Sequence, residues 1–296
     1  MTLTTLLTGG SFFEGPRWHD GSWWVSDFYR GTVSRVSPAG EETVVLEVPT
    51  QPSGLGWLAD GSLVVVSMTD QRLLRWDGEA TTTYADLSPY CGGLLNDLVV
   101  DGAGHVFAGD FGFDLMAGGA PRPGNLTRVD PDGTVTVVAE DLLFPNGMVV
   151  TADGGTLLVG ETLGNRYTAF DLAPDGALSN RRTWAEFGPA PSGGTLDEVL
   201  GQLVLAPDGC AGDAEGHVWA ADAVGGRVVR VAPGGEVVAQ VSAPDGLGVF
   251  ACALGGVDGR TLLLCCAPDF LAHLRAPVRE AVLVTTTVDV PAAGRG

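Results

Sequence analysis

The sequence repeats one short pattern six times. In each copy a turn of small residues leads into a short apolar run, an Asp- or Gly-containing turn follows, and a second apolar run ends in a polar residue. The copies open with Phe13-Glu14-Gly15-Pro16, Gln51-Pro52-Ser53-Gly54, Leu95-Asn96-Asp97, Phe144-Pro145-Asn146-Gly147, Ala206-Pro207-Asp208-Gly209 and Ala243-Pro244-Asp245-Gly246. Because a repeated unit buries its apolar face only against its neighbours, such a repeat constrains the fold more strongly than any local pattern.

The spacing of the copies indicates the architecture. They begin near residues 14, 52, 95, 144, 207 and 244, and most intervals are close to the roughly forty residues of a four-stranded propeller blade. The sequence therefore predicts an all-β fold, a six-bladed β-propeller with four-stranded antiparallel blades around a central channel. With 296 residues and 45% hydrophobic content, we expect one domain over residues 1–296.

Both ends of the chain are predicted to complete the ring. Residues 281–290 have the pattern of a last strand. Residues 1–8 are expected to pair into the final blade, because that pairing removes open sheet edges. No segment shows sustained helical periodicity, and residues 271–281 would form either one short helix or a loop.

Two insertions interrupt the repeat. The third unit carries extra loop at residues 116–125, and the fourth carries a longer insertion at about 185–203. Loops of this length in a compact domain are usually functional or mobile. We predict that the second insertion forms a flap beside the functional site.

The charge balance excludes some functions. The chain has 36 Asp and Glu against 16 Arg, no Lys, and a formal net charge of −20. Without Lys, Schiff-base chemistry is excluded, and the acidity argues against nucleic acid as a partner because phosphates require cationic contacts. An acidic surface is compatible with a bound cation, and equally with a device that keeps the protein soluble.

We expect a cytoplasmic protein without membrane contact. Residues 1–7 lack the basic start and long apolar core of a signal peptide, and no apolar run is long enough to span a membrane. The five cysteines are odd in number and lack zinc-type spacing, which favours reduced thiols. The sequence does not indicate an oligomeric state.

The repeat places a polar residue just before the innermost strand of each predicted blade. These residues are Glu14, Ser53, Asn96, Asn146, Asp208 and Asp245. Equivalent positions of a propeller form a ring at one mouth of the channel, so we expect these side chains to converge. Carboxylate and amide oxygens suit a hard cation such as calcium, and the absence of His and Cys argues against a structural zinc site.

A second ring is predicted where the second strand returns to the same mouth. Its members are Asp27, Ser67, Asp110, Glu161 and Asp222. Either they contact a ligand, or they cap turns and hold the loops between blades.

In their order and spacing, these motifs resemble one known family. The phrases Glu14-Gly15-Pro16, Asn96-Asp97, Pro145-Asn146-Gly147 and Pro207-Asp208-Gly209 are similar to those of the senescence-marker-protein/gluconolactonase/luciferin-regenerating-enzyme family of six-bladed propellers. The resemblance covers nearly the whole chain. It implies one divalent metal ion, calcium first and otherwise zinc, magnesium or manganese, held by Glu14, Asn146 and Asp208.

The resemblance also implies a reaction, hydrolysis of a small-molecule lactone or related ester. The metal would polarise the carbonyl, and Asp208 would act as general base toward water, with Asp97 as the less favoured candidate. Asn96 would donate its amide to a substrate oxygen.

Two positions depart from the sugar-lactonase pattern. Leu94 stands where such members tend to have an Arg, and Asp114 stands where some have a Glu. With Asn96 and Phe111, these residues are expected to contact the substrate. The pocket therefore suits a polyhydroxylated sugar acid less well and an apolar substrate better. Several Phe near the motifs would line the pocket or pack between blades: Phe12, Phe13, Phe111, Phe113 and Phe144.

Two alternatives to a hydrolase remain open at this point. The same site would also serve an isomerase, a lyase or a ring-opening enzyme of a biosynthetic pathway. A non-catalytic propeller that binds a metabolite or a protein is the other alternative, because fold alone does not define function.

Overall fold

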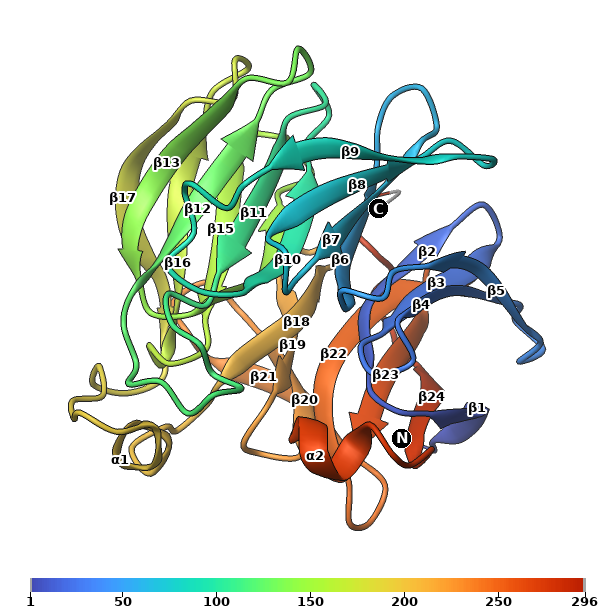
Figure 1. The fold of residues 1–296 in the computed structure, drawn as a ribbon. Coiled ribbons are helices and arrows are strands. Elements are labelled where there is room, and N and C mark those ends of the chain that lie inside the picture. The colour runs from blue at the N-terminus through green and yellow to red at the C-terminus, as the bar shows by residue number, and fades with distance from the viewer. Residues whose placement is uncertain (1, 295–296) are drawn as a thin grey trace.

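The computed structural model describes residues 2–294, which form six four-stranded antiparallel sheets around a central axis (Figure 1). This arrangement confirms the predicted six-bladed β-propeller. In each blade the first strand is innermost, because it is the strand that contacts the first strands of neighbouring blades.

The first three blades follow the chain without a break. Blade one comprises β2 (Phe13–His19), β3 (Ser22–Asp27), β4 (Thr32–Val36) and β5 (Glu42–Glu47). Blade two comprises β6 (Pro52–Trp57), β7 (Leu63–Ser67), β8 (Arg72–Trp76) and β9 (Thr81–Asp86). Blade three comprises β10 (Leu95–Val100), β11 (Val106–Asp110), β12 (Gly124–Val129) and β13 (Val135–Leu142).

The second half repeats the plan, except in the last blade. Blade four comprises β14 (Pro145–Val150), β15 (Thr156–Glu161), β16 (Arg166–Leu172) and β17 (Leu178–Glu186). Blade five comprises β18 (Pro207–Gly212), β19 (Val218–Asp222), β20 (Arg227–Val231) and β21 (Val237–Ser242). Blade six comprises β22 (Gly248–Gly255), β23 (Thr261–Ala267), β24 (Ala281–Thr287) and the N-terminal β1 (Thr4–Gly10).

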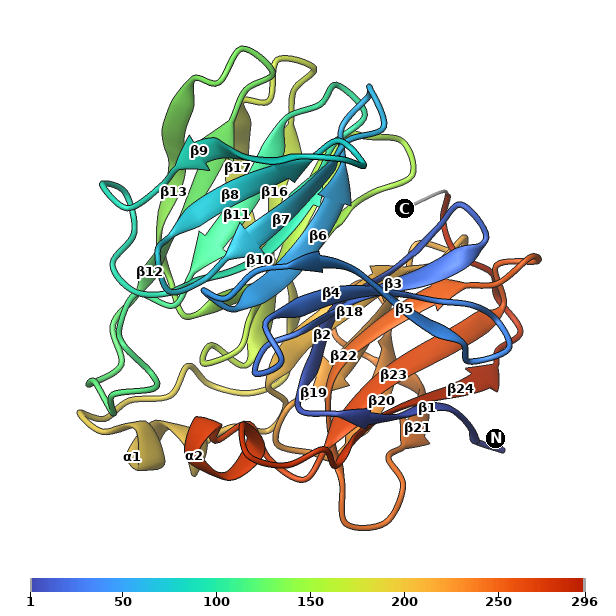
Figure 2. The ribbon, with the colours of Figure 1, turned by 45° about the vertical axis from the view of Figure 1, so that its right-hand side comes forward.

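Closure of the ring joins the two ends of the described chain. β1 is the outermost strand of blade six and pairs with β24, with Thr4 opposite Thr285 and Gly10 opposite Ala281 (Figure 2). The predicted pairing of the N-terminal segment is therefore confirmed, apart from Met1, which lies outside the described residues. Closure removes the exposed edges that an open sheet would present.

Burial decreases from the inner strands to the rim. All residues of β7 and β11 are buried, because the second strand packs between two neighbouring blades, whereas Thr81–Thr83 at the start of β9 are exposed. The core lies between blades, as where Trp24 and Val33 of blade one pack with Leu55 and Leu63 of blade two. This explains why second strands such as β7 and β11 are mostly continuous apolar runs instead of alternating ones.

The two short helices lie on the same side of the propeller (Figures 1 and 2). α1 (Leu196–Leu200) lies in the long insertion, and α2 (Ala272–Arg275) shows that the segment after residue 271 is helical. Thr195 and Glu198 form a capping box that stabilises α1. The insertion begins after Glu186, slightly later than predicted. No helix among residues 2–294 is long and apolar enough to cross a membrane.

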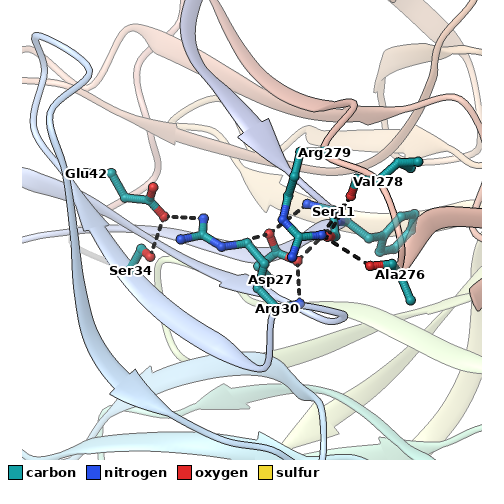
Figure 3. Close-up of polar contacts among 9 residues, drawn as sticks. Ser11, Asp27, Arg30, Ser34, Glu42, Ala276, Val278 and Arg279 are labelled. Atoms are coloured by element: carbon teal, nitrogen blue, oxygen red, sulfur yellow. Dashed lines mark hydrogen bonds and ion pairs between the residues drawn. The ribbon is translucent and has the colours of Figure 1, made fainter.

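The residues of the predicted second ring hold loops and lie outside the lining of the central cavity. Asp27 accepts hydrogen bonds from the backbone N–H groups of Ser11 at 2.8 Å and Phe12 at 3.2 Å (Figure 3). Glu161 accepts one from Leu143 and Asp222 accepts one from Ala206, each in the segment leading into an innermost strand. Asp110 binds the N–H groups of Gly92, Gly112 and Asn125, and Ser67 contacts Thr50 and Asp70. Buried carboxylates here satisfy backbone donors that no sheet partner reaches.

Candidate active site

A β-bulge in the innermost strand holds three of the central polar residues, Asn96, Asn146 and Asp208, and the fourth, Glu14, directly precedes one. In β10, Leu95 pairs with Asp110 and Leu98 pairs with Ala108, so Asn96 and Asp97 oppose a single residue. The same irregularity occurs in β14 and β18, at Asn146 and Asp208. An extra residue bends a strand and re-aims its side chains. A bulge repeated in successive blades therefore brings corresponding residues to the same level of the channel.

The glycines that follow these residues allow the innermost strands to approach closely. A Cβ atom on Gly147 would lie 2.4 Å from the carbonyl oxygen of Asp208 in the next blade. A Cβ on Gly15, whose φ is +55°, would lie 2.5 Å from the carbonyl oxygen of Ser53. A larger residue at either position would push adjacent blades apart.

Four predicted residues line one cavity at the channel mouth: Glu14, Asn96, Asn146 and Asp208. They come from β2, β10, β14 and β18, one from each of four blades. The cavity has a volume of about 120 Å³. The exposed fraction of each residue is 9% or less, so their polar atoms are shielded from bulk solvent.

Hydrogen bonds to neighbouring residues orient the side-chain amides of Asn96 and Asn146. The Nδ2 group of Asn146 donates to Thr162 Oγ1 at 3.1 Å, and that hydroxyl in turn donates to the Pro207 carbonyl at 2.7 Å. The Nδ2 group of Asn96 donates to the Pro145 carbonyl at 3.3 Å. Because the amide nitrogens are assigned by these acceptors, the Oδ1 atoms of both residues remain available to a ligand.

Burial and neighbouring negative charges raise the pKa values of both carboxyl groups. Burial raises the pKa of Glu14 well above its ordinary value, and the Asp208 carboxylate raises it further, against one hydrogen bond from the Gly15 N–H at 2.9 Å. Burial also raises the pKa of Asp208 well above its ordinary value, while the nearby Asn146 amide acts in the opposite direction. Two desolvated carboxylates beside amide oxygens form a set of donors that could hold a cation.

Asp97, the second candidate base, lies apart from this group. It does not line the cavity. Its Oδ1 atom accepts hydrogen bonds from Arg17 Nη2 at 3.0 Å and from the Leu98 N–H at 2.8 Å. Asp97 therefore neutralises a half-buried arginine of blade one.

The sixth residue of the predicted ring, Asp245, does not lie at the cavity. Asp245 is an exposed residue of a turn, and the innermost strand β22 begins only at Gly248. The bulge of that strand falls at Phe250, which lines the cavity in place of an acid. The prediction that Asp245 joins the ring is therefore wrong, because Pro-Asp-Gly is also an ordinary turn sequence.

Three other expected positions lie outside the cavity lining. Ser53 is buried, and its carbonyl accepts a hydrogen bond from Ser26 Oγ at 2.6 Å. Leu94 is partly buried against the core. Asp114 is exposed and caps a turn, accepting from the Ala117 N–H at 2.9 Å.

The walls of the cavity are aromatic. Phe111 stacks on Phe144 with ring centroids 4.2 Å apart, and Phe12 packs against Phe250 at 4.9 Å. Phe144 has a φ of +63°, unusual for a bulky side chain. Phe12, Phe111 and Phe144 line the cavity as the pattern allowed, whereas Phe13 and Phe113 are buried outside its lining.

Both insertions reach the cavity. Leu115 and Met116 come from the loop after β11, and Leu196 and Leu200 come from α1. The structure also adds lining residues that the sequence did not reveal, including Phe28, Thr162, Val224 and Phe270. The backbone carbonyl of Phe270 accepts a hydrogen bond from Tyr29 Oη at 2.6 Å. Phe28 and Thr162 occupy one repeat position, directly after the second-ring residues Asp27 and Glu161, whereas Phe270 has no counterpart in the repeat.

Comparison with known proteins identifies the family. Residues 12–267 match the model of the SMP-30/Gluconolactonase/LRE-like region. The match covers most of the chain, and the chain belongs to this family.

Curated relatives and solved structures agree with this assignment. Pentonolactonase XacC of Haloferax volcanii is 32% identical over 270 residues, covering 87% of this chain and 82% of that protein. A 6-deoxy-6-sulfogluconolactonase of Pseudomonas putida is 28% identical over 81% of this chain and 77% of its own length. The structure of a regucalcin from Agrobacterium tumefaciens, described as a calcium-binding protein, has a TM-score of 0.76 at 23% identity. It covers 96% of this chain and 92% of its own.

Proposed function

We propose that this protein is a divalent-metal-dependent hydrolase of a lactone or related ester. One observation carries the proposal: the buried Glu14 and Asp208 share a cavity with two asparagines whose amide oxygens are free. Lactone hydrolysis is also the activity in the names of the two curated relatives.

The residues present fit a hard cation. Among residues 2–294, no three His, Cys, Asp or Glu side chains gather as a metal cage, so a cation would depend on two carboxylates and an amide oxygen. Glu14, Asn146 and Asp208 would hold it, and water would complete the shell. Neutralising two repelling carboxylates offsets their desolvation. Calcium fits this oxygen set first, with magnesium, manganese and zinc as alternatives.

When bound, such a cation supplies Lewis-acid polarisation of the substrate carbonyl and lowers the pKa of water. Asp208 accepts the proton of the attacking water as general base. Glu14 and Asn146 position the group, and the second N–H of Asn96 donates to a substrate oxygen. The apolar walls exclude bulk water, which strengthens each electrostatic contact.

Turnover of a lactone panel by metal-stripped protein tests this proposal. The panel runs from sugar acid lactones to apolar γ- and δ-lactones, with calcium, magnesium, manganese and zinc added back one at a time. We expect one ion to restore hydrolysis and Asp208→Ala to abolish it. A bound metal without turnover of any lactone would indicate an isomerase or lyase reaction, and no bound metal would indicate a binding propeller.

A further inference from the structure

Apart from a small group of polar residues at its centre, the lining of the cavity is apolar. Of its 19 lining residues, 14 are apolar, and six of these are phenylalanine. The five polar lining residues are Glu14, Asn96, Asn146, Thr162 and Asp208. All polar lining side chains therefore belong to the proposed catalytic group or to Thr162, which supports it.

That polar group has little capacity left for a hydroxylated substrate. The Thr162 hydroxyl already donates to the Pro207 carbonyl and accepts from Asn146. Asn96 and Asn146 each use one N–H in the wall. The polar atoms left over are the second N–H groups and the Oδ1 atoms of the two asparagines, and the proposed cation and ester oxygen take part of these. Most hydroxyls of a sugar acid would therefore lose their hydrogen bonds to water on entry without replacement, which costs binding free energy.

The side chains of the cavity also supply no positive charge for an anionic substrate. Its lining includes no Arg or His among the described residues, and the chain has no Lys. Arg17 is paired with Asp97 and lies outside the lining. The proposed divalent cation is neutralised by Glu14 and Asp208, so a carboxylate, phosphate or sulfonate substituent would still lack a cationic side chain as partner, and burying an unpaired charge is strongly unfavourable.

The two insertions form the roof of the cavity, and the side chains that they add to its lining are also apolar. Leu196 and Leu200 are four residues apart in α1, so they share one helix face, whereas Asp197 and Glu198 are exposed. Leu115 and Met116 come from the other insertion. Figure 1 shows α1 within the long loop between β17 and β18.

We propose that the substrate is a neutral lactone or ester carrying an alkyl or aryl substituent, which the phenylalanine walls and the α1 roof enclose. This inference rests on the hydrolase activity proposed above. The volume of about 120 Å³ is comparable to cavities of roughly 150 Å³ that accept benzene. It therefore matches one small ring, with a short substituent extending toward the roof.

A matched series of γ-lactones tests the inference. The full-length protein with calcium is assayed on γ-butyrolactone and its γ-ethyl, γ-butyl and γ-phenyl derivatives, and on hydroxylated and carboxylated analogues of similar size. We expect kcat/KM to rise about fourfold for each added methylene until the cavity is filled. Equal or better use of the hydroxylated or carboxylated lactone than of the γ-butyl derivative would overturn the proposal.

Two variants test which lining residues bind the alkyl or aryl substituent. Leu196→Asn and Val224→Asn should reduce the gain per methylene, and Val224 is 47% exposed, so its replacement leaves the fold intact. Asp197→Asn, on the exposed side of α1, is the matched control and should keep the full gain. An unchanged gain in both Leu196→Asn and Val224→Asn would show that these walls do not bind the substituent.

A binding measurement separates this inference from the hydrolase proposal. Calorimetry with the corresponding γ-lactams, which resist hydrolysis, reports affinity without turnover. If no lactone is hydrolysed, the hydrolase proposal fails, and the lactams still decide the ligand class. Tighter binding of γ-butyl and γ-phenyl lactams than of hydroxylated ones supports the apolar site, and the reverse order overturns it.

Discussion

Asn96 and Asp97 are consecutive residues of one β-bulge, but Asn96 lines the cavity whereas Asp97 is ion-paired with Arg17 at 3.0 Å. Asp97 occupies the position that neighbouring blades fill with glycine, at Gly54 and Gly147. A Cβ on Gly54 would lie 2.5 Å from Asp97 Oδ1, so the carboxylate packs directly against blade two. This placement favours Asp208 over Asp97 as the general base.

Substitution of the two acids should separate their roles. Asp208→Asn is expected to lower kcat by at least about 100-fold, because a general base contributes on the order of 10²–10⁴. Asp97→Asn should retain most turnover and lower thermal stability, since Arg17 loses its partner. Both are measured as kcat at saturating metal together with thermal unfolding. Full activity in Asp208→Asn with loss in Asp97→Asn would reverse the assignment.

Metal binding should stabilise the folded protein through Glu14. A ligand at about 100 times its Kd adds about 2.7 kcal/mol to the free energy of unfolding. We therefore expect calcium to raise the melting temperature of chelator-treated wild-type protein, and Glu14→Gln to lose most of that increase. Asp245→Asn is the matched control because Asp245 is exposed and outside the cavity. An equal increase in Glu14→Gln would place the metal elsewhere.

The metal-free protein should lose stability as pH rises. The pKa values of Glu14 and Asp208 are raised by burial above their ordinary values of 4.5 and 3.8. Between the ordinary and the raised values the folded state holds protons that the unfolded state has released, so the free energy of unfolding falls with increasing pH across that window. Unfolding of chelated protein at a series of pH values measures this fall.

Asp208→Asn provides the comparison for this pH dependence. The variant should show a shallower decline than wild type, because one of the two titrating groups is absent and the pKa of Glu14 loses the effect of the Asp208 charge. Parallel curves for the two proteins would show that other buried acids, such as Asp27 and Asp110, cause the decline.

Removing the Glu161 carboxylate, which binds Arg166 of β16 and the segment before β14, should destabilise blade four. Its carboxylate is fully buried and binds Arg166 at 2.7 Å and 2.8 Å and the Leu143 N–H at 2.8 Å. Glu161→Ala leaves these donors unpaired and is expected to cost about 3 kcal/mol. The exposed pair of Arg182 and Asp171 in the same blade is the control, and Arg182→Ala should cost less than about 1 kcal/mol in chemical denaturation. Similar losses of unfolding free energy in the two variants would show that the buried Glu161 contacts stabilise blade four no more than an exposed ion pair does.

Much of the fold was predictable because the repeat is nearly periodic. Its spacing gave the number of blades, and the need to remove sheet edges gave the closure of β1 onto β24. Four ring residues, Glu14, Asn96, Asn146 and Asp208, were identified because a polar residue at the same point of successive blades must meet near the axis.

The sequence alone determined the blade plan and the polar centre, because both follow from a local pattern that each unit repeats. The tertiary structure decided what surrounds that centre. Asp245 and Asp208 share the same phrase, yet only the strand register shows that Asp245 remains in a turn while Phe250 reaches the cavity. Part of the wall follows the repeat, because Phe28, Phe111 and Ala223 each come directly after a second-ring residue. Phe270 and α1, which also line the cavity, have no place in the repeat. Packing between segments distant in sequence brought Phe270 and α1 to the cavity, and spacing along the chain carries no record of that packing.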